Sequence, residues 1–181
     1  APQIPLLFMG EEWQAPEHYL FFCDFEPALA ALVRDGRCRE FTAFAAFDAA
    51  AATCIPDPTA PATFVRSRLD RRHAAEPAHA AWTALYRRLL EIRRAEIVPR
   101  LSGARGLAHA VSEAGVIGVQ WRLGDGTRLE LHANLCDSPA SGPVPAAARP
   151  LFVSAARDEA GWRSGHYPPW LVTWGLADEH S

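Results

Sequence analysis

Two adjacent carboxylates, Glu11 and Glu12, follow an apolar run and are the residues best suited to chemistry in this chain. Glycoside hydrolysis uses a pair of carboxyl groups, separated by roughly 5 to 5.5 Å when the configuration is retained and roughly 6.5 to 9.5 Å when it is inverted. Neighbouring residues of one loop could form such a pair. The same carboxylates could instead accept backbone N–H bonds and fix the loop, which is the interpretation we favour, or contact a substrate.

Aromatic residues follow these carboxylates at once, namely Trp13, Tyr19, Phe21 and Phe22. Aromatic faces beside acidic groups are typical of sugar-binding clefts, although buried core is the more common role of such residues. Further along, Arg66 is suited to clamp a carboxylate or a sugar hydroxyl.

Other classes of site are not indicated by the sequence. The seven histidines have no metal-binding spacing, the four cysteines are far apart, and no Gly-rich phosphate loop is present, so we expect neither metal nor cofactor. The net charge is −3 and all 18 basic residues are Arg, which argues against nucleic acid as the main partner. No apolar stretch approaches the roughly 18 residues of a membrane helix. We expect a protein of the reducing cytoplasm.

The elements that would position the glutamates begin with the run 4–9. It lacks polar alternation, so it predicts a strand buried on both faces, as in parallel sheets, with the glutamates at its carboxyl end where α/β barrels keep their chemistry. Such a strand needs neighbours that the preceding residues do not supply. We therefore expect the chain to be the C-terminal piece of a larger protein, and the unpaired strand to rearrange or to drive self-association.

Helices are predicted at 26–33, ended by Gly36, and at 77–98, which starts at a proline and is ended by Pro99. Between them, residues 43–52 are a low-complexity Ala-Phe-Asp stretch. Three prolines within 55–61 forbid regular structure there. This connection is expected to be a long irregular loop.

Beyond Gly103 the pattern becomes that of strands. Residues 116–123 and 127–135 predict a β-hairpin, because the intervening Asp125-Gly126 favours a tight turn. On its second strand, Leu129, Leu131 and Ala133 would face one side, and Arg128, Glu130 and His132 the other. A Pro/Ala-rich linker is predicted at 138–150, with further strands at 151–155 and 170–176. A domain boundary is expected near residue 101.

The same residues resemble a known family. The run 4–13 resembles the eighth barrel strand of the α-amylase superfamily, and the segments 33–41 and 56–70 are similar to those of malto-oligosyltrehalose trehalohydrolases. The helix at 79–94 resembles the last barrel helix of that family, and the remainder, ending in Pro168-Pro169-Trp170, its C-terminal β domain. The implied fold class is α+β as a fragment: the last strand and helix of a (β/α)8 barrel (1–101), then an antiparallel β-sheet or sandwich domain (102–181).

The resemblance also implies a function. The parent enzyme would cleave the α-1,4 bond next to trehalose in maltooligosyl trehalose, with an Asp nucleophile and a Glu acid/base that both lie upstream of this chain. No residue here then inherits a catalytic role. Glu12 matches a glutamate that orders the barrel mouth, and Glu11, Trp13 and Arg66 would be rim contacts to this substrate or to a maltooligosaccharide. The alternatives are a separate carbohydrate-binding or interaction module and the same region of a branching enzyme.

Overall fold

The computed structural model describes residues 1–42, 55–146, 149–154 and 159–177. The chain divides into two compact units. We call residues 7–85 the loop unit, and residues 1–6 with 86–181 the sheet unit. The first residues are part of the sheet unit, where Arg93 donates to the carbonyl oxygens of Ala1 and Pro2. The predicted low-complexity stretch 43–52 lies outside the described residues.

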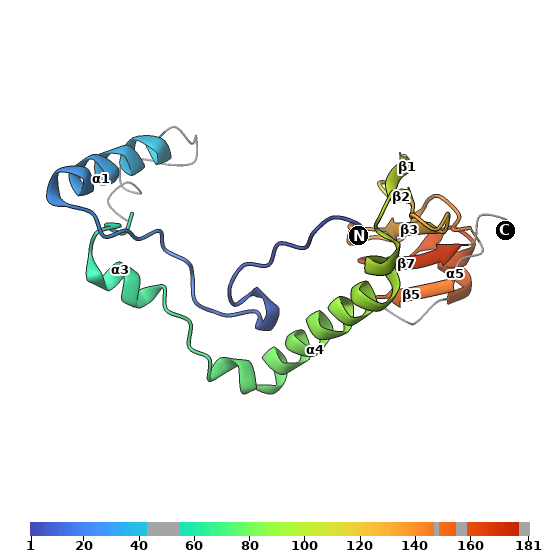
Figure 1. Cartoon of the computed structure of the whole chain (residues 1–181), viewed down its shortest axis with the longest axis horizontal. Coiled ribbons are helices and arrows are strands. Elements are labelled where there is room, and N and C mark those ends of the chain that lie inside the picture. The colour runs from blue at the N-terminus through green and yellow to red at the C-terminus, as the bar shows by residue number, and fades with distance from the viewer. Residues whose placement is uncertain (43–54, 147–148, 155–158, 178–181) are drawn as a thin grey trace. The chain divides into compact units, whose positions relative to one another are not determined.

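The loop unit has little regular structure. Its elements are the 3-10 turn η1 (Glu11–Trp13), the helices α1 (Pro27–Thr42) and α3 (Pro61–Arg66), the turn η2 (His73–Ala75) and the first part of helix α4 (Pro77–Ile92). Helix α1 and the start of α4 are seen in blue and green in Figure 1. Residues 55–60 form no helix or strand, as predicted. The prediction fails at Pro61, which begins α3, because a proline is tolerated at the first position of a helix.

The strand predicted at 4–9 is wrong, because these residues form no strand. Ile4 and Leu6 are 90% and 95% exposed. Within the described residues no neighbouring strand pairs with this segment, and an apolar run without ladder partners gains nothing from strand geometry. Its sequence pattern is that of a buried strand, but the segment is exposed to solvent in this structure.

Two helix boundaries also differ from the prediction. Helix α1 continues through Gly36, which does not take the positive φ of a helix-ending glycine. An internal glycine costs only about 1 kcal/mol relative to alanine, which is too little to end the helix. Helix α4 is regular only to Ile92 and passes into a π turn, η3 (Arg93–Ile97), and a 3-10 turn, η4 (Val98–Arg100). Pro99 lies within η4. Its missing N–H and its ring are incompatible with a regular helix, which loosens the turns before it.

The sheet unit confirms the antiparallel β-sheet. Five strands lie side by side in the order β1, β2, β3, β7, β5 (Figure 1). Their bounds are Arg105–Val111, Ile117–Arg122, Arg128–Ala133, Val172–Ala177 and Arg149–Val153. A separate pair joins β4 (Ala140–Ser141) to β6 (His166–Tyr167), and a short helix, α5, covers Glu159–Arg163.

The predicted hairpin is confirmed as β2 and β3, which pair from Ile117↔Ala133 to Arg122↔Arg128. Gly126 takes a φ of 88°, as the tight turn requires. The predicted strands 151–155 and 170–176 correspond to β5 and β7. The linker predicted at 138–150 also holds the short strand β4.

Both faces of the sheet are covered. On one face Ile97, Leu123, Leu129 and Leu176 form an apolar cluster, next to which Trp121 and Trp174 stack with ring centroids 5.6 Å apart. The opposite face is also closed, by a cluster of Val116, Trp162, Tyr167 and Leu171. The alternation predicted along β3 therefore holds, but its polar side is buried.

Gly124 joins the hairpin to η4 and generates a test of this packing. Its N–H donates to Arg100 O at 2.8 Å, and a Cβ on Gly124 would lie 1.7 Å from Ser102 O, which is backbone and cannot rotate away. We expect Gly124→Ala to lower the free energy of unfolding by about 3 kcal/mol. Urea unfolding followed by tryptophan fluorescence measures this change.

Gly106→Ala is the matched control, since a Cβ there would meet nothing within 4 Å. Its free energy of unfolding should stay within about 0.5 kcal/mol of wild type. Equal stability of the two variants would contradict the described junction between η4 and the hairpin.

Candidate functional site

The two carboxylates predicted as substrate contacts, Glu11 and Glu12, lie on η1 and bind their own loop. Gly10 opens the turn with a φ of 90°, and a Cβ there would lie 2.8 Å from Ala15 Cβ. Glu11 Oε2 accepts the N–H of Phe8 at 2.9 Å, and Glu12 Oε2 accepts the N–H of Gly10 at 3.0 Å. Both side chains thus supply acceptors that the turn's backbone lacks, which is the loop-fixing arrangement considered from the sequence.

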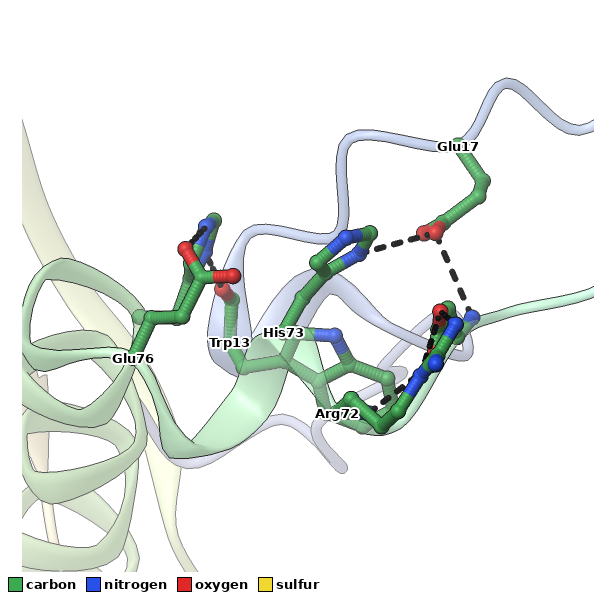
Figure 2. Close-up of polar contacts among 7 residues, drawn as sticks. Trp13, Glu17, Arg72, His73 and Glu76 are labelled. Carbon is green, nitrogen blue, oxygen red and sulfur yellow. Dashed lines mark hydrogen bonds and ion pairs between the residues drawn. The ribbon is translucent and has the colours of Figure 1, made fainter.

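Trp13, the third predicted residue, ends η1 and is half-buried. Its carbonyl oxygen accepts a hydrogen bond from His79 Nδ1 at 2.7 Å, which ties the loop to helix α4 (Figure 2). Its indole Nε1 is buried and has no hydrogen-bond partner in the described part of the chain. The ring therefore serves as packing, and its polar edge is unused.

Glu17 makes a second tie between this loop and the residues before α4 (Figure 2). Its Oε1 lies 3.0 Å from His73 Nδ1 and accepts the N–H of Asp70 at 3.3 Å. Asp70 in turn receives the side chain of Arg72, with Nη2 to Oδ2 at 2.5 Å. Hydrogen bonds from the Arg72 side chain and backbone hold the pKa of the Asp70 carboxyl well below its usual range. The loop 13–19 is therefore fixed on the segment 70–79.

A pocket of about 400 Å³ opens within the loop unit beside η1. Phe8 and Tyr19 meet edge to face at its wall, with ring centroids 5.3 Å apart. Its lining residues are Phe8, Met9, Gly10, Glu11, Gln14, Ala15, Glu17, His18, Tyr19, Ser67 and Leu69. It combines carboxylates, an imidazole and aromatic surface, which suits a polar ligand with apolar faces such as a sugar.

The structure brings only part of the predicted set to this pocket. Glu11 lines it, whereas Glu12, Trp13 and Arg66 are not among its lining residues. Arg66 is the last residue of α3 and is exposed. Sequence reasoning missed Glu17 and Ser67. Ser67 is buried, accepts the Leu20 N–H at 3.0 Å and lies 3.0 Å from Leu20 O, a contact across 47 residues that no local pattern reveals.

Asp57 organises the turn that leads into α3. Its Oδ1 accepts the Thr59 N–H at 2.9 Å and the Thr59 hydroxyl at 2.8 Å, and its Oδ2 lies 3.1 Å from Arg34 Nε. These hydrogen bonds from Thr59, followed by the charge of Arg34, hold the pKa of Asp57 below its usual value. Thr63 Oγ1 donates to Asp57 O at 2.6 Å and closes the turn. The Asp57 carboxylate therefore has a structural role in this turn.

The sheet unit has its own polar cluster, centred on Glu130, which is 1% exposed. Its oxygens receive Gln120 Nε2 at 2.9 Å, Arg128 Nε at 3.0 Å and the Ala146 N–H at 3.0 Å. Burial alone would raise the pKa of Glu130, but His132, Arg128 and this N–H hold it below its usual value. The carboxylate is enclosed by its partners, so it is a structural charge.

Neither a metal-binding cluster nor a membrane-spanning helix is found among the described residues. No group of three or more His, Cys, Asp or Glu side chains in residues 1–42, 55–146, 149–154 and 159–177 is placed to hold a metal ion. None of the helices in those ranges has the length and apolar character needed to cross a membrane.

Comparison with known proteins identifies the relatives of this chain. Residues 104–174 match a family model described as a domain of unknown function, DUF3459. The chain is 34% identical over 144 residues to a malto-oligosyltrehalose trehalohydrolase of Deinococcus radiodurans. This alignment covers 74% of this chain and 24% of that protein. It is 43% identical over 94 residues to one of Rhizobium sp. strain M-11, covering 51% of this chain and 15% of that protein.

A solved structure gives the same picture. A crystal structure of a candidate alpha amylase from Salmonella typhimurium aligns with 97% of this chain and 28% of its own, with a TM-score of 0.77 and 34% identity. The resemblance inferred from the sequence is thereby confirmed. The chain spans about a quarter of the length of the Deinococcus radiodurans and Salmonella typhimurium proteins.

The contacts of Asp57 generate a prediction about pH. Because its pKa is lowered by folding, its contribution to stability is complete above the usual aspartate pKa, about 4, and is lost as the pH falls through the folded-state pKa. Thr59→Val removes one donor and should raise the pKa of Asp57. The variant should be less stable at neutral pH and lose less stability on acidification. Carboxyl NMR titration and urea unfolding measure the two effects.

Thr83→Val is the control, because the Thr83 hydroxyl contacts only His79 O. It should leave the pKa of Asp57 unchanged. If Thr59→Val also left it unchanged, the described Asp57 turn would be incorrect.

Proposed function

The chain is similar to malto-oligosyltrehalose trehalohydrolases over most of its length, and from this we propose that it is the C-terminal region of such a glycoside hydrolase. The whole enzyme would cleave the α-1,4 bond next to trehalose in maltooligosyl trehalose. In the whole enzyme, where upstream strands would pair with the run 4–9 that forms no strand here, residues 1–101 would supply the last strand and helix of a (β/α)8 barrel. Residues 102–181 would supply the C-terminal β domain. The 34% identity over 144 residues is the observation that carries this proposal.

Exposed apolar surface supports the barrel assignment. Helix α4 has no buried residue, and Trp82 on it is 40% exposed. The segment that carries Ile4 and Leu6 is also open to solvent. Surfaces of this kind are normally covered in a folded protein, and a barrel body would cover both.

The role of this region would be to shape a cleft and not to break the bond. Glu11 and Glu12 each accept a backbone N–H of their own turn, so both carboxylates are engaged in holding the loop. Glu11, Tyr19 and Glu17 line the pocket beside η1 and would contact the sugar. The ties at His79 and His73 would hold this loop in place during binding.

Incubation of the 181-residue chain with maltotriosyl trehalose tests whether this region can cleave the bond without the upstream part of the enzyme. We expect no trehalose or maltotriose by chromatography, because a retaining mechanism needs two dedicated carboxyl groups. A chimaera tests the same point positively. It joins the upstream part of the Deinococcus radiodurans relative to this chain in place of the matching region, and should release both products.

Within that chimaera, Arg66→Ala should raise KM severalfold, because a guanidinium contact to sugar hydroxyls is lost. Arg68→Ala is the control, since Arg68 is exposed on the same segment and should leave KM unchanged. Trehalose released by the chain alone, or a folded chimaera that releases none, would contradict the proposal.

The exposed apolar segment predicts self-association of the isolated chain. Sedimentation velocity should show oligomers that increase with protein concentration. Replacing Ile4 and Leu6 together with serine should shift the distribution toward monomer, whereas Val144→Ser, at another exposed apolar position, should not. A wild-type chain that stays monomeric at all concentrations would show that this surface needs no cover.

A further inference from the structure

We propose that the sheet unit carries a second carbohydrate site, at Trp170 and the adjoining hollow, which binds an α-1,4-linked maltooligosaccharide. The site is separate in sequence and structure from the pocket beside η1. Only the class of ligand rests on the proposed function. The placement of the site rests on the backbone, exposure and surroundings of Trp170.

Trp170 combines a strained backbone with an exposed side chain. Its φ is 58°, and Gln14 is the other non-glycine residue with positive φ among those described. This conformation is an outlier for a bulky residue and costs about 1–3 kcal/mol. The indole is nevertheless 61% exposed, so burial of the ring does not offset the cost. Strain of this kind is concentrated at functional sites.

The surrounding backbone fixes this conformation. The Trp170 N–H donates to Cys136 O at 3.2 Å, and Trp170 O accepts the Ser154 hydroxyl at 3.2 Å. One residue later, the Leu171 N–H donates to Pro168 O at 3.4 Å. The ring is therefore presented to solvent from a rigid base.

A fully buried asparagine supports the same turn from below. Asn134 Nδ2 is within hydrogen-bond distance of Ser138 O at 2.9 Å, Pro168 O at 3.0 Å and Tyr167 O at 3.1 Å. Asn134 Oδ1 accepts the Cys136 N–H at 3.1 Å. Tyr167 is anchored in turn through its hydroxyl, which donates to Pro143 O at 2.5 Å. A ligand would meet a preformed surface.

A hollow of about 340 Å³ is lined by residues 139–141 and by residues 166–169, the segment that leads directly into Trp170. Its wall includes Pro168, Pro169 and Pro139, which give apolar surface, and Ser141 and His166, which face each other across β4 and β6. None of its lining residues is Arg, Asp or Glu. Apolar faces with a hydroxyl and an imidazole, and without charge, suit a neutral sugar better than an anion.

The other tryptophans of the sheet unit have structural roles, which sets Trp170 apart. Trp162 is buried in the core, and Trp121 stacks on Trp174. Trp82 on α4 is also exposed but has ordinary helical backbone. It provides the control for removal of an exposed indole.

The test is a titration of the 181-residue chain with maltoheptaose, followed by calorimetry and by NMR of the indole N–H groups. In wild type, the resonance that is missing in Trp170→Gly should shift on binding. Trp170→Gly should weaken binding at least about tenfold, which corresponds to the loss of one aromatic contact. Its melting temperature should be equal to or above that of wild type, because glycine accepts positive φ without strain. Trp82→Ala should bind as wild type does.

Trp170→Asn is the second variant, since asparagine also tolerates the left-handed region, and it should lose binding in the same way. Equal affinity of wild type and both Trp170 variants would overturn the inference and move the sugar to the pocket beside η1, leaving the proposed function intact. No binding by wild type, or equal binding of cellohexaose, would also overturn it. Failure of the proposed function would be seen separately, as a chimaera that releases no trehalose.

Discussion

The sheet unit depends on strand β3 being buried on both of its faces. A charge on such a strand needs partners, because a buried charge without them would cost several kcal/mol. Glu130 meets this requirement through Gln120, Arg128 and the Ala146 N–H. The last of these contacts ties the segment after β4 onto the sheet, so one carboxylate determines how that face is closed. Tyr167 lies over the neighbouring His132, and burial followed by the charge of Glu130 raises the pKa of its hydroxyl.

The loop unit solves a different problem, since it has many backbone groups and little regular structure. Carboxylates and hydroxyls supply the missing partners: Glu11 and Glu12 for η1, Asp57 for the turn before α3, and Ser67 for the chain at Leu20. These groups satisfy N–H donors that a helix or sheet would otherwise pair. An acidic residue in such a loop is therefore not by itself evidence of catalysis. A loop held by these hydrogen bonds is suited to the proposed role of shaping a cleft.

Sequence reasoning was most accurate where local pattern and local chemistry agree. The hairpin of β2 and β3 was predictable because Gly126 follows an Asp within alternating strands. Strand β1 has no such signal in the sequence. Every residue of it is exposed, so the strand carries no apolar period from which it could be predicted. The run 4–9 misled for the opposite reason. Its apolar pattern reports the surroundings it is suited to, and no strand in the described residues pairs with it.

The family resemblance, the antiparallel sheet and the candidate residues Glu11, Glu12, Trp13 and Arg66 could all be inferred from the amino-acid sequence alone. These conclusions rest on short segments whose residue types suffice. Three features became visible only in the folded chain: Glu11 lines a pocket with Glu17, Glu130 is buried, and Trp170 is exposed on a strained backbone. The physical reason is that burial and hydrogen-bond partners are set by segments tens of residues apart, which no local period or spacing encodes.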